Sequence, residues 1–150
     1  MDLEEQYDKI YRYCYFKVRR RETAEDITQE TFLRFFESKR YISRGQSLQY
    51  LYTIARNLCS DEYRRQKTEP LENETAGNYS DDNMITQISL RATLSELDET
   101  DRELLLLRYV NEVPVNVISK LYGISRFSVY RKISKAAKEL KSRLGKEDFL

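Results

Sequence analysis

Residues 115–144 read VNVISKLYGISRFSVYRKISKAAKELKSRL and predict a short helix, a tight turn and a longer second helix. In the second helix, apolar side chains recur at the spacing of a buried face; they are Val129, Ile133, Ala136, Leu140 and Leu144. Gly123 suits the left-handed conformation that ends a helix, and Ser125 can cap the next one. Together these features indicate a helix-turn-helix.

The second helix of this motif is strongly basic. Residues 116–146 carry nine Lys and Arg side chains and one acidic side chain, Glu139. In a helix-turn-helix, the N-terminal residues of the second helix meet base edges in the major groove. The candidate DNA contacts are Arg126, Phe127, Ser128, Arg131, Lys132 and Lys135, with Lys138 and Lys141 nearer the phosphates. A solvated basic helix is the alternative, but charge, turn and position together favour DNA binding.

Two more helices are predicted before the motif. One runs from about Ile85 to Glu96. The other begins near Thr100–Glu103, which reads as a capping box, and continues through the aliphatic run Leu104–Leu107. Asn111–Pro114 ends this helix, because proline lacks the amide hydrogen that a helix interior needs.

The N-terminal part predicts three helices, over Tyr7–Arg19, Thr23–Ser38 and Leu48–Arg65. Thr23–Asp26 reads as a capping box, and Ser47 can cap the third helix. The second helix has an apolar side made of Ala24, Ile27, Phe32, Phe35 and Phe36. Its other side forms an acidic stripe made of Asp26, Gln29, Glu30, Leu33 and Glu37. This acidic stripe fits a solvated face or a docking surface for a basic partner helix.

The third helix and the loop before it combine aromatic, amide and arginine side chains. The loop Lys39–Gln46 includes Tyr41 and Arg44. One face of the helix carries Tyr50, Thr53, Asn57, Asp61 and Arg64, with Arg56 and Arg65 at its edges. Aromatic rings stack on bases and arginines reach phosphates, so this face suits single-stranded DNA. An ordinary amphipathic helix with a tyrosine on its flank is the alternative.

The net charge of +1 is a cancellation between segments. It is +3 over residues 1–67, −7 over 68–102 and +5 over 103–150. Residues 68–83, TEPLENETAGNYSDDN, contain too few apolar side chains to offset the entropy of ordering them. The predicted architecture is therefore all-α. It has two small helical domains, 1–67 and 91–146, a flexible acidic linker over 68–90 and a tail over 147–150.

Composition excludes several kinds of chemistry. The chain has no histidine and two cysteines, Cys14 and Cys59, which excludes histidine-based catalysis and the usual four-ligand zinc sites. No spacing brings a nucleophile to a base, so we expect no enzyme activity, no metal and no cofactor. The N-terminus has no apolar stretch of a signal peptide, and no run approaches the about 20 residues of a membrane span. The expected compartment is the cytoplasm, without membrane insertion.

On these motifs the chain resembles the extracytoplasmic-function sigma factors, which are short bacterial transcription initiation factors. AEDITQETFLRFFES (24–38) is similar to the family's polymerase-binding helix, and the match implies that Asp26, Gln29, Glu30 and Leu33 meet the clamp helices of β′. LQYLYTIARNLCSDEYRR (48–65) resembles the helix that recognises the minus-ten element. The implied minus-ten contacts are Tyr41, Arg44, Tyr50, Asn57, Asp61, Arg64 and Arg65.

The C-terminal motif resembles the family's minus-thirty-five reading domain over LDETDRELLLLRY and YGISRFSVYRKISKAAKEL. Two departures stand out. Val117–Ser119 replaces the usual Glu-Ile-Ala before the turn, and Phe127 occupies a position that is commonly glycine. Bulk at the start of the helix can alter which bases are read, so the family's promoter consensus does not transfer to this chain.

The resemblance implies a specificity subunit that directs promoter-specific initiation and leaves catalysis to the polymerase. Its implied partners are core RNA polymerase (the β and β′ subunits), promoter DNA and the anti-sigma factor that the family commonly has. The alternative is a conventional helix-turn-helix regulator whose N-terminal domain binds a ligand or dimerises. Copurification with core polymerase distinguishes the two, because only a sigma factor has to bind core.

Overall fold

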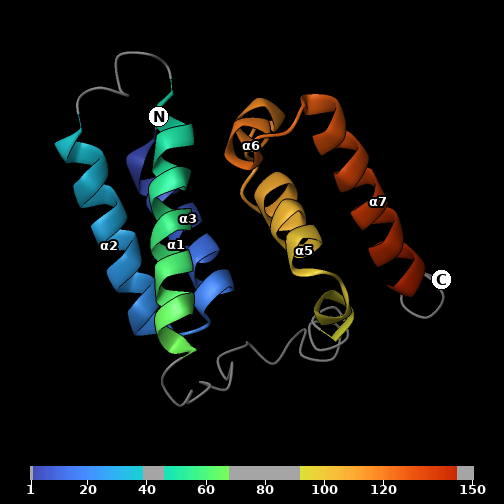
Figure 1. Cartoon of the computed structure of the whole chain (residues 1–150), viewed down its shortest axis with the longest axis horizontal. Coiled ribbons are helices and arrows are strands. Elements are labelled where there is room, and N and C mark those ends of the chain that lie inside the picture. Colours follow the sequence, from blue (N-terminus) through green and yellow to red (C-terminus); the bar gives the residue numbers. More distant parts are fainter. Residues whose placement is uncertain (1, 39–45, 68–91, 145–150) are drawn as a thin grey trace. The chain divides into compact units, whose positions relative to one another are not determined.

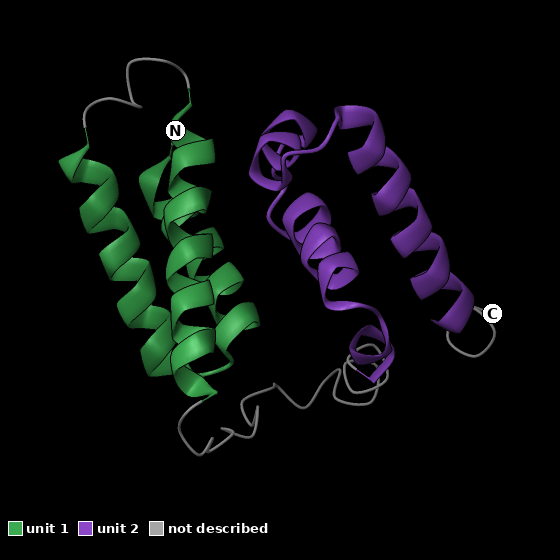
Figure 2. Cartoon of the chain, viewed as in Figure 1, with its two compact units in different colours: residues 1–75 green, residues 76–150 purple. Residues whose placement is uncertain are grey.

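A computed structural model describes residues 2–38, 46–67 and 92–144 of the chain. The chain divides into two compact units, Met1–Thr75 and Ala76–Leu150 (Figure 2). All regular structure in the described residues is helical (Figure 1), which confirms the predicted all-α architecture with two helical domains. The predicted linker 68–90 and tail 147–150 lie outside the described residues, and the exact domain boundaries stay predictions.

The first unit contains three helices, α1 (Leu3–Val18), α2 (Arg21–Glu37) and α3 (Ser47–Gln66), and each packs against the other two. Only Arg19 and Arg20 connect α1 to α2. Arg19 has the left-handed conformation (φ 59°), and its amide donates a hydrogen bond to the carbonyl of Tyr15. This tight connection forms an antiparallel helical hairpin, which places α2 beside α1 (Figure 1).

The core of this unit combines aliphatic, aromatic and threonine side chains. Cys14 is buried, as is Cys59 on α3, and no disulfide joins these two cysteines. The rings of Tyr13 and Tyr52 meet edge to face with their centroids 5.8 Å apart. Thr28 and Thr31 of α2 are also fully buried. Their hydroxyls donate to carbonyls one helical turn back, over 2.6 and 2.7 Å, so both threonine hydroxyls are paired in the core.

Three of the predicted N-terminal helix caps are wrong. The helix α2 begins two residues before Thr23, α3 begins at Ser47 itself, and α5 begins one residue before Thr100. None of these three helices has a side-chain hydrogen bond at its N-cap. For α2 the physical reason is the two-residue connection from α1, which leaves no room for a longer entry. The first helix also begins earlier than predicted, because Asp2 caps it by accepting from the amide of Glu4 over 3.1 Å.

The second unit consists of a helical turn at residues 92–96, α5 (Glu99–Leu105), the π-helix η3 (Leu106–Val110), α6 (Val115–Tyr122) and α7 (Arg126–Leu144). The helix α7 packs against both α5 and α6. In η3 the backbone hydrogen bonds span five residues instead of four, as in the bond from the amide of Asn111 to the carbonyl of Leu106 over 2.9 Å. The chain then leaves the helix, and the predicted break at 111–114 is confirmed.

The buried face of α7 supplies much of the core of the second unit. Val129, Ile133, Ala136 and Leu144 are buried as the periodicity predicts, and Leu140 is half-buried. The buried carboxylate of Glu103 on α5 accepts a hydrogen bond from the hydroxyl of Tyr122, the last residue of α6. This bond ties the end of α6 to α5 immediately before the turn that leads to α7.

Candidate protein and DNA interfaces

The acidic stripe of α2 faces solvent. Asp26, Gln29 and Glu37 are exposed, and Leu33 exposes 58% of its surface. The carboxylate of Glu30 is the exception, because Arg34 one turn further along binds it over 2.8 Å. Asp26 has no ion-pair partner among the residues that the structure describes. The stripe therefore presents the unpaired carboxylate of Asp26, the partly neutralised carboxylate of Glu30, the exposed Glu37 and an exposed leucine.

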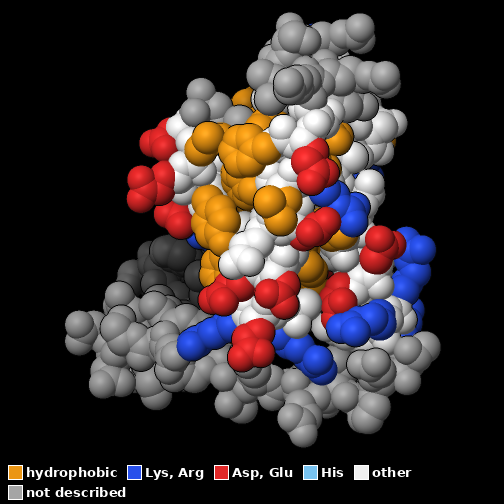
Figure 3. All heavy atoms as spheres, turned by 90° about the vertical axis from the view of Figure 1, so that its left-hand side faces the viewer, with side chains coloured by type: hydrophobic (Ala, Val, Ile, Leu, Met, Phe, Trp, Pro, Cys, Tyr) orange, Lys and Arg blue, Asp and Glu red, His pale blue; other side chains and the backbone are white. Residues whose placement is uncertain are grey.

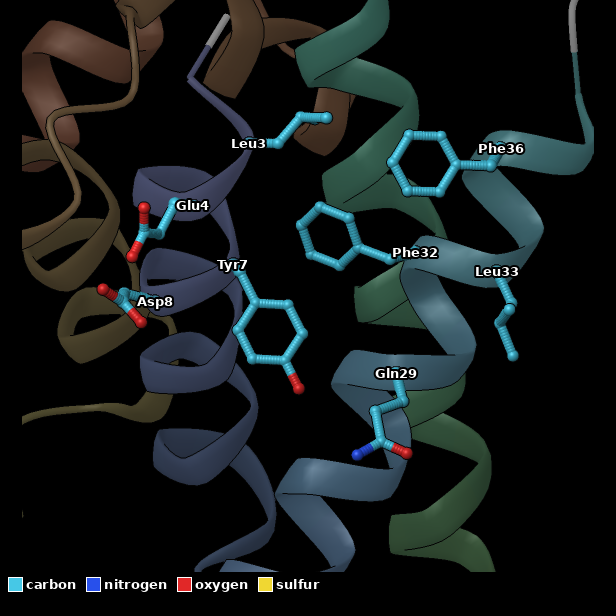
Figure 4. A pocket seen from close by; sticks show the side chains of 8 residues that line it. All are labelled: Leu3, Glu4, Tyr7, Asp8, Gln29, Phe32, Leu33 and Phe36. Carbon is cyan, nitrogen blue, oxygen red and sulfur yellow. The ribbon is translucent and has the colours of Figure 1, made fainter.

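An apolar groove of about 730 Å³ lies between this stripe and α1. Figure 4 shows its lining: Leu3, Glu4, Tyr7 and Asp8 from α1, and Gln29, Phe32, Leu33 and Phe36 from α2. The rings of Tyr7 and Phe32 form its floor, with their centroids 5.3 Å apart. Phe36, which the sequence predicts on the apolar side of α2, is 52% exposed and forms part of the groove instead of the core.

The groove joins the acidic stripe, because Gln29 and Leu33 belong to both. In the space-filling view of this side of the molecule (Figure 3), a band of hydrophobic side chains has acidic side chains on both of its sides. Glu4 and Asp8 provide the carboxylates on the α1 rim, opposite α2 (Figure 4). A surface of this composition suits an amphipathic helix that carries both apolar and basic side chains.

On the candidate single-strand face of α3, some side chains are exposed and others are held by contacts within the first unit. Asn57, Asp61 and Arg64 are exposed, and Arg64 lies 3.6 Å from Asp61. The Nε and Nη2 atoms of Arg65 donate to the two carboxylate oxygens of Glu62, over 3.1 and 2.9 Å. Tyr50 is half-buried and its ring centroid lies 6.2 Å from that of Phe35. The two loop candidates, Tyr41 and Arg44, lie outside the described residues.

The turn between α6 and α7 has the predicted chemistry. Gly123 takes the left-handed conformation, with φ of 66°, and ends α6. Ser119 of α6 bonds across this turn, because its hydroxyl donates to the carbonyl of Ile124. Ser125 then caps α7, since its hydroxyl oxygen accepts from the amide of Ser128 over 3.1 Å. The helix-turn-helix is thus held by backbone and side-chain hydrogen bonds on both sides of the turn.

Five of the six candidate DNA contacts on α7 are exposed. Ser128 differs because it is half-buried, and its hydroxyl lies 3.0 Å from that of Ser125. Phe127 exposes 73% of its surface, the largest exposure of any large hydrophobic side chain in the described part of the chain. The guanidinium of Arg131 lies over its ring at 5.9 Å from the centroid. The exposed candidates are Arg126, Phe127, Arg131, Lys132 and Lys135.

The sequence interpretation missed Tyr130, which is exposed on α7 between the buried Val129 and the exposed Arg131. Its spacing of three residues from Phe127 was the available signal. At the other end of α7, Arg143 binds Glu96 over 2.5 Å and Glu139 over 3.2 Å. The hydrogen bond that Arg143 donates to Glu96, followed by the one that it donates to Glu139, raises the pKa of Arg143 above its usual value. Arg143 is therefore engaged within the second unit.

The second unit carries a smaller apolar groove of about 250 Å³. It is lined by Leu105, Tyr109, Ala137, Leu140, Lys141 and Leu144. Within residues 2–38, 46–67 and 92–144, no group of three or more His, Cys, Asp or Glu side chains could hold a metal ion. None of the helices that the structure describes is both long and apolar enough to cross a membrane.

Comparison with known families matches the two units separately. Residues 3–69 match the model of sigma-70 region 2, and residues 87–140 match that of sigma-70 region 4. The chain is 27% identical to the ECF RNA polymerase sigma factor SigW of Bacillus subtilis, over 91% of this chain and 83% of SigW. It is 29% identical to the RNA polymerase sigma factor YlaC of the same organism, over 93% of this chain and 88% of YlaC.

Two further relatives differ in length or in sequence. The ECF RNA polymerase sigma factor BldN of Streptomyces coelicolor is 30% identical over 81% of this chain, but the chain spans only about half of BldN (51%). Among solved structures, the sigma factor RpoE of Bartonella quintana, in complex with the anti-sigma factor NepR, has a TM-score of 0.74 and 17% identity. That likeness covers 94% of this chain and 92% of RpoE, and it concerns the fold.

Proposed function

Because the chain belongs to the sigma-70 family, in its extracytoplasmic-function group, we propose that it is an alternative sigma factor. In this role it binds core RNA polymerase and directs promoter-specific transcription initiation. The observation that carries the proposal is the region 2 match over 3–69 followed in the same chain by the region 4 match over 87–140. A conventional helix-turn-helix regulator is not favoured, since it has no need of a region 2 domain.

Core polymerase docks, in this proposal, on the acidic stripe and the adjoining groove of the first unit. The proposed contacts are Asp26, Gln29, Glu30 and Leu33. The exposed leucine at the edge of the groove and the bare carboxylate of Asp26 support this choice. A helix of the β′ clamp then places an apolar side chain in the groove and basic side chains against the stripe. Arg34 has to release Glu30 for that carboxylate to take part, because the two are paired in the free protein.

The minus-ten strand is proposed to bind along α3. The exposure of Asn57, Asp61 and Arg64 supports direct contact by these three. Tyr50 presents only part of its ring, because the other part packs near Phe35, so the proposed stacking uses one face or edge of the ring. Three further contacts, Tyr41, Arg44 and Arg65, are proposed on the family resemblance, and Arg65 exchanges its bond to Glu62 for a phosphate.

Upstream duplex is proposed to bind α7 at its N-terminal half. The proposed contacts are Arg126, Phe127, Ser128, Arg131, Lys132 and Lys135. Their support is exposure and charge on the second helix of a helix-turn-helix, the element that enters the major groove. The hydroxyl of Ser125 already donates to that of Ser128, so any contribution of Ser128 to DNA binding is made while it is bonded to the residue that caps α7.

The remaining parts of the proposal concern partners and setting. The chain catalyses no reaction itself, needs no cofactor or metal, and works in the cytoplasm, where core polymerase and the chromosome are. Contacts with β as well as β′ are proposed from family membership. An anti-sigma factor is proposed as a further partner, and the RpoE–NepR complex, whose sigma factor shares this fold, supports that proposal.

Size-exclusion chromatography of the purified chain with purified core polymerase tests the proposal. The chain is expected to elute with core in a one-to-one complex. Prior saturation of core with a primary sigma factor is expected to block this, because both compete for one docking site. A chain that binds duplex DNA but never elutes with core overturns the sigma-factor proposal and restores the regulator alternative.

A further inference from the structure

Phe127 exposes an aromatic ring at the start of α7 in a place where folding gives no reason for one. The side chain is 73% exposed, and its only ring contact in the described residues is the guanidinium of Arg131, 5.9 Å from the centroid. The core of the second unit is formed by the opposite side of the helix, through Val129 and Ile133. An apolar ring kept in water is energetically useful only when something covers it.

The ring lies on the outward face of α7. Phe127 and Arg131 are one turn apart, and both are exposed, while the packing residues Val129, Ile133 and Ala136 are buried. At 3.6 residues per turn, Phe127 and Arg131 project nearly opposite to those packing residues. The side of the helix that faces away from the core is the side that meets DNA in a helix-turn-helix, so this aromatic ring belongs to the reading surface, at its N-terminal end.

The surroundings of the ring are basic. Arg126 precedes it in the chain, and Arg131, Lys132 and Lys135 follow on exposed positions of the same helix. No acidic residue lies within residues 113–138. A polyanion is therefore the partner whose charge fits this surface, and duplex DNA is the polyanion that the motif accommodates.

The major groove offers an aromatic side chain one apolar group, the 5-methyl of thymine. We propose that Phe127 contacts a thymine methyl in the upstream promoter element and makes the protein select thymine at that position. Arg131, stacked beside the ring, contacts the neighbouring base pair or its phosphate. This inference rests on the proposed sigma-factor function and deepens it by naming one base and the residue that selects it.

Uracil differs from thymine only in lacking this methyl group, which gives a direct test. The holoenzyme, made from the full chain and core polymerase, first selects its upstream element from a randomised duplex library. Each thymine of that element is then replaced singly by deoxyuridine. At one position, or at two adjacent ones, holoenzyme binding is expected to weaken about fourfold, which corresponds to the ~0.8 kcal/mol of one buried methyl-sized group.

Three variants assign the effect to the ring. Phe127→Ala is expected to bind thymine and uracil duplexes equally, and Phe127→Leu, which keeps apolar bulk, is expected to retain most of the difference. Tyr130→Ala is the matched control, because it removes an exposed aromatic ring from the flank of the same helix and should leave the difference unchanged. Phe127 contributes little to the core, so the alanine variant is expected to fold.

The outcomes separate this inference from the proposed function. A holoenzyme that selects an upstream element without thymine, or that tolerates uracil at every position, overturns the thymine contact but leaves the sigma factor intact. Retention of the full difference in Phe127→Ala assigns the methyl contact to another residue and overturns the inference as well. A chain that forms no holoenzyme overturns both proposals together.

Discussion

Replacing Leu33 or Phe35 with alanine separates the docking role of α2 from its structural role. The two residues lie two positions apart on the same helix, yet Leu33 is 58% exposed and Phe35 is 2% exposed. The ring of Phe35 packs near those of Phe36 and Tyr50, with centroid distances of 5.6 and 6.2 Å. Alanine at position 35 therefore removes core contacts, whereas alanine at position 33 removes mainly solvent-facing surface.

These exposures set the expected magnitudes. Phe35→Ala is expected to lower the free energy of unfolding of the first unit by about 3–5 kcal/mol, the range for truncation of a buried phenylalanine. Leu33→Ala is expected to change it by less than about 0.5 kcal/mol. A side chain that contributes to an interface hot spot is worth more than ~1 kcal/mol, so Leu33→Ala should weaken binding to core polymerase about tenfold.

Urea denaturation followed by circular dichroism measures the free energy of unfolding, and fluorescence anisotropy of the labelled chain with core polymerase measures Kd. The predicted pattern is a stable Leu33→Ala variant with weak binding and an unstable Phe35→Ala variant. Wild-type affinity in Leu33→Ala would refute docking at the acidic stripe and groove. A loss of stability in Leu33→Ala as large as in Phe35→Ala would refute the assignment of Leu33 to the surface.

Asp26→Lys is expected to slow association with core severalfold at low salt without changing stability. Glu25→Lys makes the same charge change at an exposed position that is not part of the stripe and should slow association less. Equal effects of the two variants would indicate that net charge alone matters. Gly123→Ala is expected to lower the free energy of unfolding of the second unit by about 1–2 kcal/mol, because a residue with a Cβ is strained at φ of 66°. The added Cβ meets nothing within 4 Å, so the backbone strain is the whole effect. Unchanged urea unfolding would contradict this. If Lys132 or Lys135 reads a base, its replacement by alanine is expected to cost about 1–3 kcal/mol of promoter-binding free energy and to relax the base preference at one position. If the lysine binds phosphate, the same replacement weakens binding to all promoters and lowers the slope of the salt dependence by about one. Unchanged promoter binding in filter-binding assays would remove the lysine from the interface.

Apolar periodicity predicts the packing faces of the helices well, and hydrogen-bond patterns that depend on tertiary structure less well. The face of α7 through Val129 and Ile133 follows from spacing alone. The helix starts do not, because a capping box is a local signal, whereas the two-residue connection from α1 determines where α2 begins. Thr28 and Thr31 are polar in sequence but buried in the fold, because each hydroxyl donates to a carbonyl of its own helix and the other helices then cover it.

In the candidate surfaces, too, features of a single helix can be predicted from the sequence and features formed by packing cannot. The acidic stripe can be predicted from one helix, because its members share a face at helical spacing. The groove beside it cannot, since Leu3 and Tyr7 join it only after α1 packs against α2. Phe36 was assigned to the apolar side, but two neighbouring helices do not cover the whole apolar width of α2, and the ring borders the groove.

As an alternative sigma factor, this chain is expected to give core RNA polymerase its promoter specificity. Runoff transcription with purified core polymerase and a promoter library tests it most directly, because core alone does not initiate at specific sites. The predicted result is transcripts from a set of promoters that share upstream and minus-ten elements, formed only when the chain is added. Transcription that does not depend on the chain, or a chain that binds the same DNA without starting transcripts, would contradict the account.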